Sequence, residues 1–442
     1  MTNADIESNW DLTFFGFCTP PFLPIPDLTR ALTAPATKTT EMKYNVMRFV
    51  LALAASLLMA TSARAWELKF GTNLPPVDFH GFVSQGFLLS TDYNYLADDT
   101  TEGSFEFFEA ALNASITPFP RTRIAAQGFA FDVGEVGNHD LMLDYALVEY
   151  TFDDRIGFRG GRIRRPEGIY YHILDVDLAR TSVLLPQGMY DARWRDFLAS
   201  IDGGEIFGNL PLNDAGGLSY ELYAGVSRPT TSAGLARWIL NMLPPGSTAD
   251  HFNSPFTSGA QLWWSTPIAG LRAGMSYQRL FDFQTEFTLN LPPPPLGPGP
   301  VSSADAVDVD IGHVSLEYLW NRWTFQAEYQ RSWVSTSPDA FEYDTWYAGA
   351  AHRFNRWFET GAYYTEYYSD VTDRDGSNLA VAADAFQKDV ALSLRFDPTD
   401  WWTLKLEGHC IRGTALLRDN DHNPARNDDV WWMLAVKTTF SF

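Results

Sequence analysis

The stretch Trp402–Cys410, WTLKLEGHC, alternates two kinds of side chain with a period of two. Apolar or small residues occupy one face and polar residues the other: Trp402, Leu404, Leu406, Gly408 and Cys410 on the first, and Thr403, Lys405, Glu407 and His409 on the second. This pattern is typical of a strand with lipid on one side and water on the other. It recurs in 105–116, 323–329 and 390–396. A soluble β-sandwich would show the same alternation, so alternation by itself leaves two fold classes open.

The lengths of the connections separate these two classes. Links after most even-numbered strands are a few residues long, such as Asp153-Asp154 and Asn355-Arg356, whereas links after odd-numbered strands are mostly long, such as 228–254 and 282–304. The link 207–216 is the exception among the short ones. Short turns at one end and long loops at the other are typical of outer-membrane barrels. The sequence therefore predicts an all-β fold, a transmembrane antiparallel β-barrel of about 16 strands, near 77–90, 104–117, 121–132, 140–152, 155–163, 197–206, 217–227, 255–266, 270–281, 305–319, 322–333, 343–354, 357–368, 385–396, 401–412 and 429–442.

Aromatic residues support a membrane setting. They make up 15% of the chain and gather at strand ends beside the short turns, as at Phe119, Phe152, Trp320 and Trp357. Amphipathic rings at that level are expected to form a girdle at the membrane interface.

Composition excludes several other classes of protein. The net charge of −22 would repel nucleic acid. Cys18 and Cys410 are too few for a disulfide scaffold, and no CxxC or CxxCH motif occurs. We therefore expect no cofactor and no metal site.

The first 65 residues are expected to lie outside the barrel. Lys43 and Arg48 precede the apolar run 49–60, and Ala63-Arg64-Ala65 follows it. This arrangement predicts a secretory signal peptide at 42–65. Residues 1–41 are interpreted as an upstream extension from a mis-assigned gene start, with an unknown leader as the alternative. The barrel domain is predicted to cover 66–442.

The last strand carries a family resemblance. Its apolar face runs from Val430 to Phe442 in steps of two, and the strand ends in phenylalanine. In this it resembles outer-membrane proteins of Gram-negative bacteria. The resemblance implies the outer membrane as the location, recognition by the barrel-assembly machinery through Phe442, and contact with outer-membrane lipids and lipopolysaccharide.

The segment 162–196 interrupts the series of strands. By strand count it is the third external loop, and it is rich in arginine with interleaved aspartates. Here the chain resembles the general porins, whose third external loop folds into the lumen and sets the constriction. The run Gly161–Gly168, GRIRRPEG, is also similar to a segment of phosphate- and pyrophosphate-selective porins. The resemblance further implies a homotrimer.

The loop composition independently favours a position inside the barrel. Long loops without turn-rich composition are usually functional, and the apolar side chains of this loop would sit poorly in water. We predict that the loop narrows the pore and that its constriction contains Arg159, Arg162, Arg164, Arg165, Asp175, Asp177, Arg180, Asp191, Arg193 and Arg195. The alternative is that the arginines pair with nearby aspartates and only stiffen the loop.

The predicted function is a porin, a water-filled channel for passive diffusion of small hydrophilic solutes or ions. Two other classes stay open: an outer-membrane enzyme of lipase type, and a scaffold that sheathes a partner protein. An enzyme is not expected, because the run Gly81–Gly86 places Ser84 near His80 but is not a GxSxG motif.

Overall fold

The computed structural model describes residues 66–68, 75–232, 234–240, 243–336, 340–417, 423 and 429–442. The chain divides into two compact units, Met1–Tyr44 and Asn45–Phe442, and all described residues belong to the second. The predicted upstream extension 1–41 and signal peptide 42–65 lie outside the described residues. Among the residues described, no helix has the length and apolarity needed to cross a membrane.

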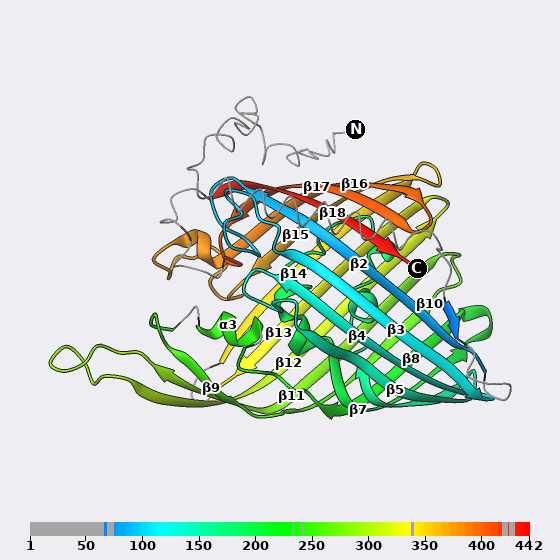
Figure 1. The fold of residues 1–442 in the computed structure, drawn as a ribbon, viewed down its shortest axis with the longest axis horizontal. Helices are drawn as coiled ribbons and strands as arrows, with labels where there is room; N and C mark the ends of the chain where they lie inside the picture. The colour runs from blue at the N-terminus through cyan, green and yellow to red at the C-terminus, as the bar shows by residue number, and fades with distance from the viewer. Residues whose placement is uncertain are drawn as a thin grey trace, which may run out of the picture. The chain divides into compact units, whose positions relative to one another are not determined.

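Sixteen antiparallel strands close into a barrel, as predicted (Figure 1). They are β2 (Val77–Ser90), β3 (Phe107–Phe119), β4 (Thr122–Val133), β5 (Leu141–Asp153), β6 (Ile156–Arg164), β7 (Ser200–Pro211), β8 (Gly217–Val226), β10 (Phe256–Ser265), β11 (Leu271–Leu289), β12 (Val301–Trp320), β13 (Trp323–Ser335), β14 (Ala340–Arg353), β15 (Phe358–Tyr368), β16 (Phe386–Thr399), β17 (Trp402–Gly413) and β18 (Val430–Ser441). Each predicted strand corresponds to one of these.

Two seams complete the ring. β18 pairs with β2, with Phe440 opposite Val83, and the backbone of Phe442 exchanges hydrogen bonds with Gly81 at 3.0 and 3.2 Å. β8 pairs with β10 from Val226 opposite Phe256 to Gly217 opposite Ser265. Two short strands lie outside the ring: β1 (Trp66–Leu68) pairs with β2, and β9 (Thr248–Phe252) pairs with β11.

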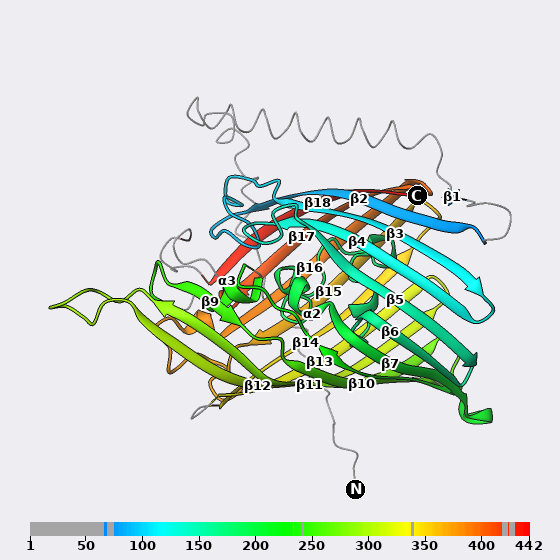
Figure 2. The same cartoon turned by 60° about the horizontal axis from the view of Figure 1, so that its bottom comes forward.

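The fifth external connection differs from the prediction. The sequence was interpreted as a loop over 282–304, but β11 runs to Leu289 and β12 begins at Val301, so a long hairpin projects from the barrel (Figures 1 and 2). Residues 301–307 of β12 pair with β11 but not with β13, whose register begins at Asp308. The extension of β11 alternates again, with Phe283, Thr285 and Phe287 buried, but a register shift between Leu280 and Phe283 reverses the phase of the alternation. This break in the pattern hid the extension from the sequence prediction.

The two faces of the barrel follow the predicted parity. Large apolar side chains point outward, as at Leu112, Met275, Val314 and Leu392. Aromatics at the short turns are exposed on the outside, among them Phe119, Phe152, Trp320 and Trp357. Trp263, at the end of β10, is an exception, because it turns inward and is buried.

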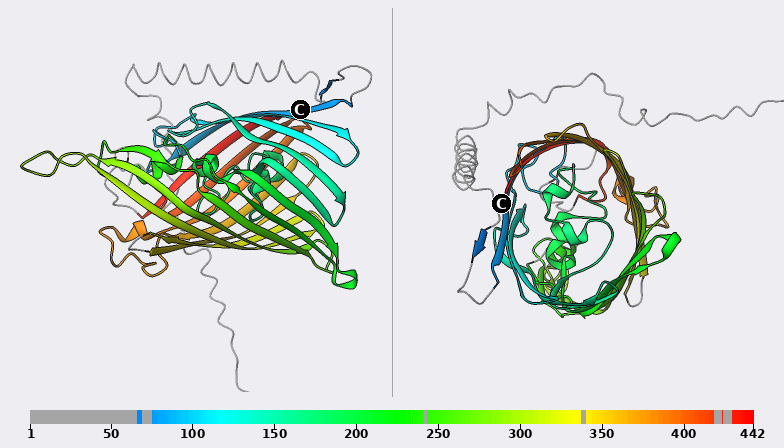
Figure 3. Two further views of the ribbon diagram at one scale, coloured as in Figure 1. Left: turned by 90° about the horizontal axis from the view of Figure 1, so that it is seen from below. Right: turned by 90° about the vertical axis from the view of Figure 1, so that its right-hand side faces the viewer.

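The third loop, with its short helical turns, lies within the ring. Viewed along the barrel, the segment from Arg165 to Ala199 crosses the interior (Figure 3, right). It contains short 3₁₀ turns at 171–173, 177–179 and 192–194 and helix α2 (Arg195–Leu198), while α3 (Gly234–Leu240) belongs to the next external loop. The barrel therefore holds a folded loop in its lumen.

Leu392→Arg tests the outward face of the barrel. Leu392 lies at the centre of β16 and its side chain points outward. An arginine facing lipid at that depth should lower the free energy of unfolding by about 2–4 kcal/mol. Urea unfolding in lipid vesicles measures the change. Leu296→Arg at the exposed tip of the β11–β12 hairpin is the control and should change stability little. Equal stability of both variants would contradict the assigned orientation.

Candidate functional site: the lumenal loop

Two glutamates on β13 and β17, four strands apart in the wall, hold the backbone of loop 165–199. Glu407 on β17 accepts hydrogen bonds from the amides of Val183 and Leu184 at 2.9 and 2.8 Å. Glu328 on β13 accepts one from the amide of Ile169 at 2.8 Å. A carboxylate that binds backbone N–H groups both satisfies those donors and fixes the chain that carries them. The loop is therefore attached at two sides of the lumen.

Each of these glutamates has support from neighbouring strands. His409 lies between Glu407 and Asp389, with its ring nitrogens 3.1 and 2.8 Å from the two carboxylates, and Ser393 also donates to Glu407. Glu328 accepts further bonds from hydroxyls of the wall and the loop: Ser315, Tyr347 and Tyr190. These partners orient the carboxylates toward the loop.

Asp177 is the most heavily bound carboxylate of the loop. Its carboxylate lies 3.1 Å from Lys437 Nζ and 3.6 Å from Lys405 Nζ, and it pairs with Arg180 at 3.3 Å. Thr439 donates to its second oxygen. Burial opposes ionisation of Asp177, but the three surrounding cations outweigh burial and hold its pKa well below its usual range.

A second ionic cluster joins the loop to β5 and β6. Arg164, at the end of β6, pairs with Asp175 at 2.6 Å and also with Asp144 of β5, and Arg195 of α2 pairs with Asp144 at 3.1 Å. Gln127 donates to both aspartates. Burial raises the pKa of Asp175, but the opposite effect of Arg164 and Arg195 is larger. The pKa of Asp175 therefore lies well below its usual range.

The remaining loop arginines are also satisfied inside the barrel. Arg165 is fully buried and donates to Gln278 at 2.9 Å and to the carbonyls of Phe197 and Leu198. Arg193 pairs with Asp191 at 3.0 Å and donates to the carbonyl of Leu416. The structure thus brings the predicted loop arginines together with carboxylates or carbonyls.

Two of the predicted arginines lie elsewhere. Arg159 faces the lumen from β6 and is bound by three glutamates, with Glu149 at 2.8 Å, Glu205 at 2.7 Å and Glu221 at 3.8 Å. Arg162 lies on the outer face of the barrel, in one row with Asp202, to which it donates at 3.2 Å. The alternation along the strands decides this, because Arg162 and Asp202 are each three residues from Arg159 and Glu205, which face the lumen. Arg162 therefore does not line the lumen.

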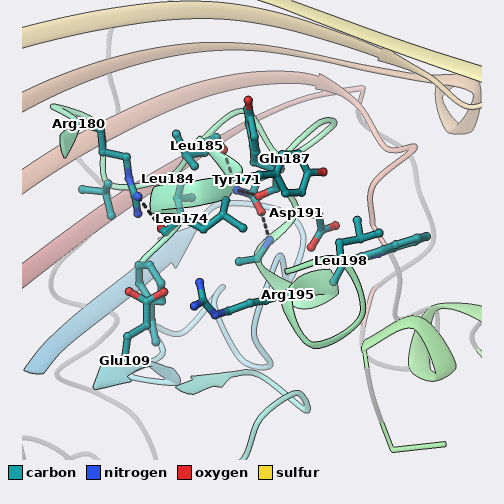
Figure 4. Close-up of a pocket in the computed structure, with 15 residues that line it drawn as sticks. Glu109, Tyr171, Leu174, Arg180, Leu184, Leu185, Gln187, Asp191, Arg195 and Leu198 are labelled. Atoms are coloured by element: carbon teal, nitrogen blue, oxygen red, sulfur yellow. Dashed lines mark hydrogen bonds between the residues drawn. The ribbon is translucent and has the colours of Figure 1, made fainter. Parts of the chain in front are cut away.

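Apolar packing completes the filling of the lumen. The Val183 and Leu184 side chains join a cluster with Phe129 and Trp431 of the wall, and Tyr171 and Tyr190 join a second cluster with Tyr347. Between loop and wall a cavity of about 50 Å³ remains, with Leu174, Leu184 and Leu185 among its lining residues together with Glu109, Arg180 and Arg195 (Figure 4). The apolar residues of the loop thus have the inner-wall environment that their composition predicts.

Sequence reasoning missed the residues of the wall that bind the loop. Glu328, Glu407, Lys405, Lys437 and Asp144 were not among the predicted site residues. A signal for four of them exists, since each occupies the polar face of a strand. Asp144 gives no such signal, because a shift of register between Gln127 and Gly128 in the β4–β5 pairing changes the facing of the residues there.

The comparisons with known proteins concern the fold. No protein-family model matches the sequence, and no curated protein matches it significantly. OmpF of Salmonella typhi, solved in complex with daunomycin, is similar in structure with a TM-score of 0.53, at 12% identity over 85% of this chain and 100% of that one. OmpT of Vibrio cholerae has a TM-score of 0.51 at 12% identity, covering 85% and 100%.

A trimer form of Vibrio cholerae OmpT folded in vitro gives the same TM-score of 0.51 at 13% identity, covering 83% of this chain and 99% of that one. These similarities define the class of fold. The chain is a transmembrane β-barrel with the fold of Gram-negative outer-membrane porins.

Asp177→Asn tests the ionic anchor of the loop. The variant leaves Lys405 buried without its carboxylate, whereas Lys437 keeps Glu109 as a partner, so the free energy of unfolding at pH 7 should fall by about 3 kcal/mol. Asp305→Asn on the exposed part of β12 is the matched control. Because the pKa of Asp177 is lowered in the folded state, its contribution should be present above about pH 4 and lost as the pH falls further. An unchanged stability at pH 7 would contradict the anchor.

Glu167→Gln tests the opposite sign of pH dependence. Burial raises the pKa of Glu167 to about 7, partly offset by Arg165 and the Tyr223 hydroxyl. The wild type should therefore lose stability as the pH rises from the unfolded-state value of about 4.3 through 7, by about 3 kcal/mol in all. The variant should lack this loss, measured as unfolding free energy at pH 4 and pH 8. Glu286 is exposed, so the control variant Glu286→Gln should still lose stability between pH 4 and pH 8 as the wild type does.

Proposed function

We propose that the protein is an outer-membrane porin that lets small hydrophilic solutes or ions diffuse past loop 165–199. The observation that carries the proposal is the position of this loop, which crosses the lumen and is bound to the inner wall through Glu328 and Glu407. A folded loop held in the lumen of a sixteen-stranded barrel narrows the passage to a constriction.

The path of the solute is proposed to follow the wall of β5, β6 and β8. There the charged side chains that face the lumen remain partly accessible, with exposed fractions of 18% for Glu149, 19% for Arg159 and 22% for Glu221. On the wall of β17, Lys405 and Glu407 are at most 1% exposed. The loop is therefore packed closely against Lys405 and Glu407 of β17 and less closely against Glu149, Arg159 and Glu221, although it also packs closely against Asp144 of β5.

The buried ionic clusters support a structural role for most of the loop arginines. Arg164, Arg180, Arg193 and Arg195 are each paired with an aspartate and 6–12% exposed at the side chain. In this proposal the arginines shape the constriction, and Arg159 is the predicted arginine that contacts the passing solute. The sequence left two roles open for these arginines, a selective filter and a stiffening network. In this proposal most of the loop arginines stiffen the loop, and Arg159 acts in the filter.

The two rival classes have less support. Ser84, the candidate nucleophile, is buried and donates its hydroxyl hydrogen bond to the carbonyl of Glu109. A partner protein sheathed by the barrel would need the space that loop 165–199 occupies. The proposed setting is the Gram-negative outer membrane, with its lipids and lipopolysaccharide around the barrel and assembly through the Phe442 signal. A homotrimer is proposed by similarity to the trimer form of OmpT.

Deletion of 170–190 tests the constriction. Ile169 and Tyr190 lie close together, since the Tyr190 hydroxyl is 3.1 Å from the Ile169 amide, so a short glycine linker can close the gap. Single-channel conductance in planar bilayers should rise above that of the wild type, because the lumen widens. Deletion of 291–299 at the hairpin tip, outside the lumen, is the control and should leave conductance unchanged. Absence of any wild-type channel would refute the porin proposal.

A further inference from the structure

The wall of β5–β8 carries a group of carboxylates around a single arginine. Glu149, Arg159 and Glu205 lie side by side on β5, β6 and β7, where the register places Arg159 opposite both glutamates. Glu221 on β8 adds a third carboxylate at 3.8 Å from the same guanidinium. His172 of the lumenal loop lies 3.1 Å from Glu221 and closes the group on the loop side.

One carboxylate of this group is incompletely satisfied. Glu205 is 3% exposed, and one of its oxygens accepts from Arg159 at 2.7 Å. Its second oxygen is buried and has no hydrogen-bonding partner among the described residues. A buried carboxylate oxygen without a donor is unfavourable, and a bound cation would relieve that cost.

The positive charge nearby does not balance the group. Arg159 is shared among three glutamates, and its guanidinium also stacks over the Phe207 ring at 4.4 Å. Arg123 of β4, which lies opposite Glu149 in the register and is exposed, is the next cation along this wall. In a formal count, with all three glutamates ionised and His172 neutral, the group has three carboxylates against two arginines.

Most arginines of the loop do not reverse this balance, because they are paired with aspartates within the loop and the wall; Arg165 is fully buried and donates to Gln278 and backbone carbonyls. Each of Arg164, Arg180, Arg193 and Arg195 has an aspartate partner and little exposed area. Charges that are paired and withdrawn from water contribute little to the field in an aqueous path, whereas accessible charges on its wall focus that field.

We infer that Glu149, Glu205 and Glu221 form a subsite for a small monovalent cation, an alkali ion or an alkylammonium or guanidinium group, and that the channel conducts cations in preference to anions. The inference rests on the proposed function. It also runs against the anion preference that the arginine-rich loop and its resemblance to phosphate-selective porins would suggest.

The test is the reversal potential of the full chain in planar bilayers under a KCl gradient. The wild type should show a higher permeability for K⁺ than for Cl⁻. The double variant Glu149→Gln/Glu221→Gln removes two charges with little change of shape, so its permeability ratio should shift toward Cl⁻. Glu342→Gln on the outer face of β14, where Glu342 pairs with Arg331, is the matched control and should leave the ratio unchanged.

The possible outcomes separate the two proposals. A conducting wild type that prefers Cl⁻, or a double variant with the wild-type ratio, would overturn the cation subsite and leave the porin proposal standing. No conductance from a correctly folded wild type, judged by heat-modifiable migration on a denaturing gel, would overturn both. If the double variant fails to fold, Glu149→Gln alone provides the measurement, because Glu149 lies on β5, at one edge of the group in the strand order β5–β6–β7–β8.

Discussion

Closure of the sheet between β18 and β2 is the interaction on which the rest of the molecule depends. In a bilayer every backbone N–H and C=O must be paired within the protein, so an open edge at either strand would be prohibitively unfavourable. Pairing of residues 433–441 with 82–90 removes both edges. Closure also creates two separate environments, an outer surface for lipid and an inner surface that must be filled or wetted.

The inner surface explains the chemistry of the third loop. A loop that enters the lumen brings backbone amides and charged side chains into a poorly hydrated space, where each needs a partner. The wall supplies these partners as single residues on several strands: Glu328 and Glu407 for amides, Lys405 and Lys437 for Asp177, and Asp144 for Arg164 and Arg195. The loop conformation is thus a property of the closed barrel, since no one strand could hold it.

The unequal attachment of the loop has a functional consequence. Where it packs against β17, the ionic partners are buried and contribute to stability. Near Arg159, by contrast, Glu149 and Glu221 stay partly accessible and one oxygen of Glu205 has no donor among the described residues, so charge remains for a solute to meet. One loop can in this way both stabilise the barrel and leave a polar path, because the buried ion pairs and the accessible charges contact different parts of the loop.

Strand positions and the inward course of the third loop could be predicted from the sequence, because alternation, turn length and strand count are local properties. Residues such as Leu392 and Glu407 show their facing by parity alone. The partners of the loop could not be predicted, because Asp177 and Lys437 are 260 residues apart and meet only after closure. Arg162 was misplaced for a related reason: a run of arginines does not reveal which of them faces outward until the register with Asp202 is known. The sequence by itself determined a barrel with a charged loop inside it, and the tertiary structure decided which charges cancel and which remain, because cancellation depends on distances across the lumen.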